Sequence, residues 1–212
     1  VSLVAIPVIA IFLLDAPPFQ VALLGTVEFL PFLLFTLPAG AWVDRLPRRL
    51  ILVAGDFGRA AALLSIPIAH QLGVLTIWQL YLVGFINGFL TVFFDVADQS
   101  FLPAILEPGD LVEGNAKLQV SGSAAMVLGQ PLGGGLVGLL TAPLAIAVDA
   151  LSFIASGGLI LAIRKREPKR EATPSAEGVL GPVAGLRAEI AEGLRYVLGH
   201  EYLRYIAAST GL

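Results

Sequence analysis

Apolar runs long enough to cross a lipid bilayer recur along most of the chain. An α-helix rises 1.5 Å per residue, so about 20 residues cover the roughly 30 Å of bilayer hydrocarbon. Because lipid offers the backbone no hydrogen bonds, each run is predicted to be a helix, which makes the chain an all-α membrane protein. The predicted spans are residues 19–42, 50–69, 76–96, 118–140 and 143–163.

The composition supports lipid as the surrounding solvent. Hydrophobic residues make up 57% of the chain, charged residues only 14%, and the mean hydropathy is +0.86. A soluble domain usually carries about 25% charged residues. The absence of cysteine excludes disulfides and thiol chemistry. With only His70 and His200 as histidines, we expect no metal site, and we expect neither a cofactor nor a nucleic-acid partner.

Both ends of the chain carry shorter apolar runs. Residues 1–14 would cover only about 21 Å of hydrocarbon at the helical rise. They lack the basic segment and the cleavage pattern of a signal peptide, so we expect a spanning helix whose beginning is missing. Another run begins near Tyr202 and continues to Leu212, and it reads as the start of a further span.

Lysine and arginine gather on one side of the predicted membrane topology. With alternating spans, the loops 43–49, 97–117 and 164–201 share a side. All 13 lysines and arginines lie in these loops or in the helix ends that adjoin them. The positive-inside rule places that side in the cytoplasm. We therefore expect a multi-pass protein of the inner (plasma) membrane.

The longest polar stretch, residues 164–185, is rich in proline, glycine and charge and is typical of a linker. Apolar residues at helical spacing follow, and they predict an amphipathic helix near residues 186–198 on the cytoplasmic membrane face. A short soluble helix packed on the bundle is the alternative. The expected parts are a transmembrane bundle (1–163), a cytoplasmic linker with a helix (164–201) and the start of a seventh span (202–212).

The turn between the second and third spans reads GAWVDRLPRRL and carries one acid and three arginines. It resembles motif A of the major facilitator superfamily, in which a glycine is followed four residues later by Asp-Arg and then by basic residues. Pro47 stands where the family usually has glycine, which should stiffen the turn. The matching residues are Gly40, Asp44, Arg45, Arg48 and Arg49.

A stretch in the fifth span, LGQPLGGGLVG, is similar to motif C, the antiporter motif of the same family. Pro131, Gly134 and Gly135 match the motif, whereas Gln130 replaces its glycine. The order of GDFGRA, QSFLPAILEPGDLVEGNAKLQ and AVDALSFIAS also resembles the branch that contains the enterobactin exporter and macrolide-efflux proteins.

The resemblance implies a secondary active transporter that works by alternating access, in which two six-helix halves rock around a central cavity. This chain would be the first half with the start of the seventh span, and alone it should not transport. The implied function is proton-coupled export of a drug, a macrolide-like compound or a siderophore. The implied partners are this small molecule, protons, lipid and a C-terminal half. A channel or passive scaffold, and an intramembrane enzyme, are the alternatives; we expect no enzyme.

In this family motif A is a cytoplasmic gate, and the resemblance gives Asp44 that role. Arg45 or Arg48 should then pair with an acid at the cytoplasmic end of the fourth span, for which Asp95 and Asp98 are available. The alternative is a set of solvated loop charges that contribute little stability.

Glu28 lies about ten residues into the second span, close to the bilayer midplane. A charge there costs about 2.5–3.5 kcal/mol on insertion scales, so such a residue is a functional candidate by default. Three roles stay open: proton coupling, binding of a cationic substrate, and a permanently protonated structural donor. We expect no basic residue at this depth. Asp56 and Arg59 read as a pair on one helix face in the headgroup region, and a functional role for them is the alternative.

Other polar and small residues also lie within the predicted spans. Asn87 and Asp149 are candidates to line a cavity or to bond between helices, and Ser152 is a possible partner of Asp149. Two glycine pairs at four-residue spacing predict close helix packing, and they are Gly84 with Gly88 and Gly134 with Gly138.

Overall fold

The computed structural model describes residues 1–43, 46–105, 109 and 111–163. These ranges form six α-helices and no strand, which confirms the all-α prediction. The predicted helix near 186–198 and the run from Tyr202 lie outside the described residues. The helices are α1 (Ser2–Phe12), α2 (Pro18–Val43), α3 (Arg48–Gln71), α4 (Ile77–Ile105), α5 (Leu111–Leu139) and α6 (Ala142–Ala162).

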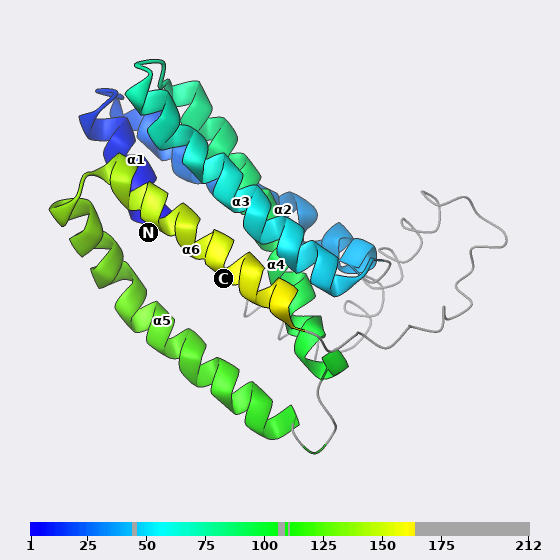
Figure 1. The fold of residues 1–212 in the computed structure, drawn as a ribbon. Coiled ribbons are helices and arrows are strands. Elements are labelled where there is room, and N and C mark those ends of the chain that lie inside the picture. The colour runs from blue at the N-terminus through cyan, green and yellow to red at the C-terminus, as the bar shows by residue number, and fades with distance from the viewer. Residues whose placement is uncertain (44–45, 106–108, 110, 164–212) are drawn as a thin grey trace, which may run out of the picture.

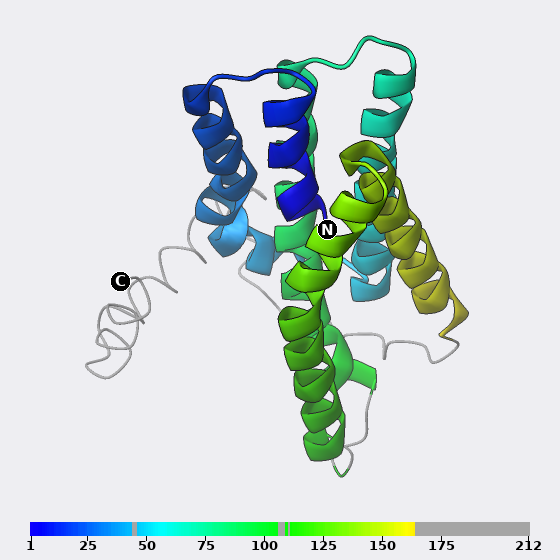
Figure 2. The same cartoon turned by 90° about the vertical axis from the view of Figure 1, so that its left-hand side faces the viewer.

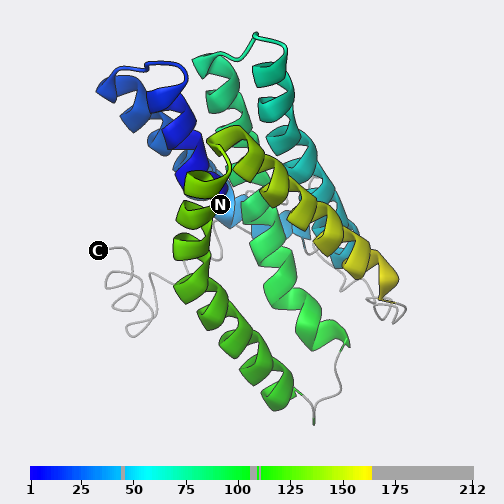
Figure 3. The ribbon, with the colours of Figure 1, turned by 60° about the vertical axis from the view of Figure 1, so that its left-hand side comes forward.

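Five helices pack side by side, and α5 stands partly apart from them. The most extensive contacts join α3 to α6, α2 to α4 and α3 to α4. Helix α1 packs mainly on α6, and α5 touches α1, α6 and α4. Figures 1 and 2 show α5 meeting the bundle near α1 and α6 and then running away from it. In Figure 3, α5 and α6 meet next to α1 and diverge from that point.

Four helices are long and apolar enough to cross a membrane: α2 over Pro18–Gly40, α3, α4 over Ile77–Phe101, and α6. Helix α1 is a shorter apolar helix. Helix α5, which we expected to span, is not among the four, because glycine, serine and glutamine dilute its apolar residues. Several helices extend past the predicted runs, since polar residues leave the hydrocarbon without ending the helix.

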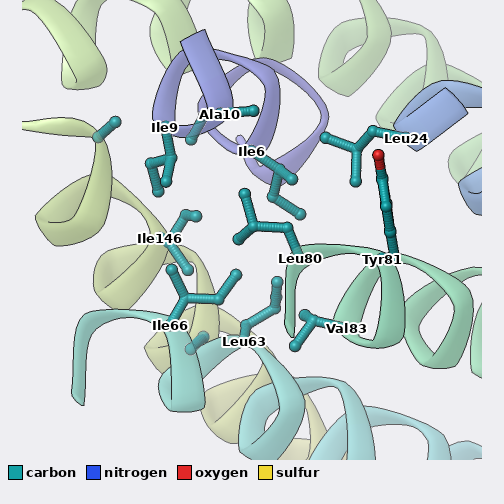
Figure 4. Packing of buried hydrophobic residues seen from close by; sticks show 13 residues of the cluster. Ile6, Ile9, Ala10, Leu24, Leu63, Ile66, Leu80, Tyr81, Val83 and Ile146 are labelled. Atoms are coloured by element: carbon teal, nitrogen blue, oxygen red, sulfur yellow. The ribbon is translucent and has the colours of Figure 1, made fainter. Parts of the chain in front are cut away.

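The bundle has two buried apolar clusters, one toward each end. The larger cluster draws side chains from five helices toward one interior, as Figure 4 shows. The smaller cluster lies at the end of the bundle where α2 ends and α3 begins, and it includes residues of α4. We call this the basic end, because Arg48 and Arg49 lie there. The large buried side chains of the first are Ile6, Ile9, Leu24, Leu63, Ile66, Leu80 and Ile146; the second contains Val43, Leu52, Ala97 and Phe101.

Candidate functional site

The motif A stretch includes the end of α2 and the start of α3, at the basic end of the bundle. Helix α2 ends at Val43 and α3 begins at Arg48. Pro47 precedes α3 with φ −60° and ψ 118°, and proline suits this position because the start of a helix needs no N–H from it. The turn therefore accommodates proline at the position where the family pattern has glycine. Asp44 and Arg45 lie outside the described residues.

Arg49 ties the start of α3 to the end of α6. Its guanidinium Nη2 donates a hydrogen bond of 2.5 Å to the carbonyl oxygen of Leu161. The last carbonyls of a helix lack intrahelical partners and carry partial negative charge, so a cation is favoured there. The motif alone did not reveal this partner, which belongs to a helix that is distant in sequence.

The two expected gate partners, Asp95 and Asp98, are exposed on α4. Asp95 interacts electrostatically with Arg59, and Asp98 with Asp56, both on α3. Within the described part of the chain, no ion pair joins Arg48 to either aspartate. Because Asp44 and Arg45 are not described, the gate network stays a prediction.

Glu28 lies in the packed seam between α2 and α4. It is the eleventh of the 26 residues of α2, and only 8% of it is exposed. A Cβ atom on Gly88 would overlap the carbonyl oxygen of Glu28 and lie 3.2 Å from the Cγ atom of Pro31. A Cβ atom on Gly84 would lie 3.9 Å from the Cβ atom of Glu28. The predicted close packing at Gly84 and Gly88 is therefore confirmed.

Asp56 and Arg59 form the predicted ion pair, but they lie deeper than expected. Arg59 is the twelfth of the 24 residues of α3, near the middle of the span instead of the headgroup region. Its Nη2 atom lies 2.6 Å from Oδ1 of Asp56, and both side chains are buried. The expectation that no basic residue shares the depth of Glu28 was therefore wrong. The electrostatic interactions of Arg59 are with Asp56, Asp95 and Asp149.

The motif C-like residues point outward from the described bundle. Gln130, Pro131, Gly134 and Gly135 are all exposed on α5. A Cβ atom on Gly134 or on Gly138 would meet nothing within 4 Å, so this predicted packing pair has no neighbour among the described residues. The buried glycine of α5 is the adjacent Gly133, whose Cβ atom would lie 3.3 Å from Val1.

Asp149 joins α6 to α1. Its carboxylate accepts a hydrogen bond of 2.9 Å from the backbone N–H of Ser2. The Ser152 hydroxyl donates a hydrogen bond of 2.7 Å to the backbone carbonyl oxygen of Asp149, and not to the carboxylate of Asp149. Asn87 on α4 is half-buried, and its Oδ1 atom has no hydrogen-bond partner within the described residues.

The sequence of the whole chain matches a known family. The model of the Major Facilitator Superfamily matches residues 1–212. The chain belongs to this superfamily. The family match and the four spanning helices identify a multi-pass membrane protein.

Two relatives of this MFS chain come from Bacillus subtilis (strain 168). An uncharacterised MFS-type transporter, YvqJ, is 22% identical over 88% of the chain and 43% of the relative. Another, YkuC, is 27% identical over 92% of the chain and 45% of the relative. The chain thus spans less than half the length of these curated relatives. No solved structure matches it.

Proposed function

We propose that this chain supplies one half of a secondary active transporter that moves small molecules by alternating access. The family match and the names of both relatives support a transporter. The buried Glu28 at mid-span is the observation that supports a transport site within the bundle, because ionisable groups at such depth mark substrate or ion pathways.

The second half of the transporter is proposed to pack on this bundle. The chain covers 43–45% of the relatives, which leaves room in them for another bundle. Helix α5 offers an exposed face of small residues, and such residues let helix backbones approach closely in membranes. Rocking of the two halves would open the cavity to each side of the membrane in turn.

We propose that the basic end faces the cytoplasm and that the transporter is an exporter of the inner membrane. Apart from the mid-span Arg59, the one-sided distribution of lysine and arginine in the sequence supports this orientation. Asp44, Arg45 and Arg48 would form the gate at that end, where Arg49 already fastens α3 to α6. Drug-like compounds, macrolide-like compounds and siderophores are the proposed substrates.

Proton coupling is proposed to use Glu28. The carboxyl is buried against α4, and no ion pair joins Glu28 to a cation among the described residues. A group of this kind takes up a proton readily and can release it when the cavity opens to water on the other side.

Binding of a cationic substrate at Glu28 is the second role for the same residue, and the aromatic rings of the α2–α4 seam favour it. Phe32 and Phe35 follow Glu28 at helical spacing, on the same face of α2. The ring of Phe35 packs edge-on against that of Phe89, with 4.9 Å between the ring centres. The ring centre of Phe89 lies 4.8 Å from that of Phe93, also on α4. Aromatic faces attract cations, so a carboxylate beside them suits a lipophilic cation.

Glu28→Gln in the full-length protein, reconstituted in proteoliposomes, tests these roles. Coupling predicts that export driven by a pH gradient is lost while substrate binding survives. Selective loss of cationic substrates would favour the binding role. Glu113→Gln is the matched control, because Glu113 is exposed and pairs with Lys117 on the surface of α5. Normal pH-driven export by Glu28→Gln would refute coupling at this residue.

A further inference from the structure

Helix α2 is held to α4 differently on the two sides of its midpoint. At the end away from the basic end, the Tyr81 hydroxyl of α4 donates a hydrogen bond of 3.1 Å to the carbonyl oxygen of Gln20, in the first turn of α2. Tyr81 also lies in the larger buried cluster, together with Leu24 of α2. The first part of α2 is therefore fixed to α4 by a hydrogen bond and by buried side chains.

Helix α4 is also tied to α3 at this end of the bundle. The side-chain amide of Gln79 donates a hydrogen bond of 3.0 Å to the carbonyl oxygen of Ser65 and one of 3.2 Å to the Ser65 hydroxyl oxygen. Polar side chains bond membrane helices together in this way. The first part of α2 thus rests on a pair of helices that are themselves joined.

The second part of α2, residues 32–43, is held by ring contacts. No hydrogen bond joins these residues to α4 within the described part of the chain. The ring centre of Trp42 lies 5.8 Å from that of Phe93, and Phe35 packs on Phe89 one to two turns before. Aromatic pairs are favourable over ring-centre distances of about 4.5–7 Å, so these contacts tolerate small movements of one helix against the other.

Pro31 lies at the boundary between the two parts. Proline has no N–H, so the carbonyl oxygen of Val27 has no donor from its own helix, and helices bend readily at such a residue. A Cβ atom on Gly88 of α4 would lie 3.2 Å from the Cγ atom of Pro31 and would overlap the carbonyl oxygen of Glu28. The weak point of α2 therefore coincides with its close backbone contact on α4.

Two further features weaken the helix after Pro31. Pro38 removes the intrahelical donor for the carbonyl oxygen of Leu34. The Thr36 hydroxyl donates to the carbonyl oxygen of Phe32, and bonds of this kind often bend helices. The second part of α2 is thus both less firmly attached and less stiff than the first.

We propose that α2 has a hinge at Pro31, about which its second part moves on α4 while its first part stays fixed. Val43 lies 12 residues past Pro31, a lever of about 18 Å, so a bend of about 20° would move the end of α2 by about 6 Å. The movement separates the rings between Glu28 and the basic end, and it carries the motif A turn with it. Bending inside one half goes beyond the rocking of two halves, in which distances within each half stay constant.

The test measures distances within the bundle and needs neither substrate nor transport. Pairs of spin labels would be placed on the full-length protein in lipid nanodiscs, and pulsed electron double resonance would give their distance distributions. This chain contains no cysteine, and any cysteine outside it would be replaced by serine. Leu37→Cys with Gln99→Cys reports the hinged side, and Phe19→Cys with Leu82→Cys reports the fixed side; all four positions are exposed.

The expected result is a broader or two-peaked distribution for the hinged pair, because the same bend moves Leu37 by about 3 Å at the helical rise. Pro31→Ala restores the missing N–H and should narrow this distribution to the width found for the fixed pair. Pro67→Ala, at a buried proline of α3, is the matched control and should leave it broad. A hinged-pair distribution no wider than that of the fixed pair, or one that Pro31→Ala leaves unchanged, would overturn the proposal.

Discussion

Gly88 of α4 lies directly against the backbone carbonyl of Glu28 on α2, so closely that a single added methyl group would overlap the oxygen. The backbone of α2 at the mid-span acid is thus in close contact with α4. Gly84, one turn earlier, is less crowded, because its Cβ atom would meet the nearest atoms at 3.9 Å.

Gly88→Ala is expected to destabilise the α2–α4 packing. Extra carbon in a well-packed interior costs about 1–3 kcal/mol, and here the obstacle is backbone that cannot turn aside. Thermal unfolding of the purified protein in detergent would show a lower midpoint. Gly84→Ala is the matched control and should unfold close to the unmodified protein. Equal stability of the two variants would contradict the described contact.

Arg59→Met is expected to destabilise the bundle strongly, since it leaves Asp56 buried without its cation. Breaking one partner of a buried ion pair typically costs about 3–5 kcal/mol. The double variant with Asp56→Asn should recover much of the loss, which a double-mutant cycle of unfolding free energies would measure. Arg59→Lys should rescue poorly, because an ammonium group does not stack on the rings of Phe94 and Phe153 as the planar guanidinium does.

Arg49→Ala is expected to loosen the basic end of α6. It removes the hydrogen bond to Leu161, and hydrogen bonds to charged groups contribute about 1.5–3 kcal/mol when they are protected from water. This bond is exposed, so the effect should fall at or below the lower limit. Amide hydrogen exchange should become faster in the last turn of α6 and stay unchanged in its first turn. Lys117→Ala on the surface of α5 is the control.

Asp44→Asn is expected to slow transport without preventing membrane insertion. Loss of the carboxylate would weaken the proposed gate at the basic end, while the apolar spans that direct insertion are unchanged. Substrate export from cells and the amount of protein in the membrane fraction are the two measurements. Export at the normal rate would show that Asp44 has no part in a gate.

The lengths of the apolar runs predicted where the described helices lie, because hydrocarbon thickness sets the length of a spanning helix. The apolar runs did not predict which side chains surround the guanidinium group of Arg59. Its neighbours Phe94 and Phe153 are far away in sequence, and only helix packing brings them to the guanidinium. Likewise, the small residues of α5 indicate that another segment could approach closely, but they do not identify it. Gly133 packs against Val1, whereas Gly134 has no close neighbour among the described residues.

The pairing of Asp56 with Arg59 inside one helix also bears on how the protein is made. Helix α3 emerges from the ribosome before α4 and α6, and so before either aromatic ring that encloses the guanidinium. Because its counter-ion is only three residues away, α3 can enter the bilayer with its charges already matched. The cation–ring contacts can then form last, when α6 is synthesised and docks on α3.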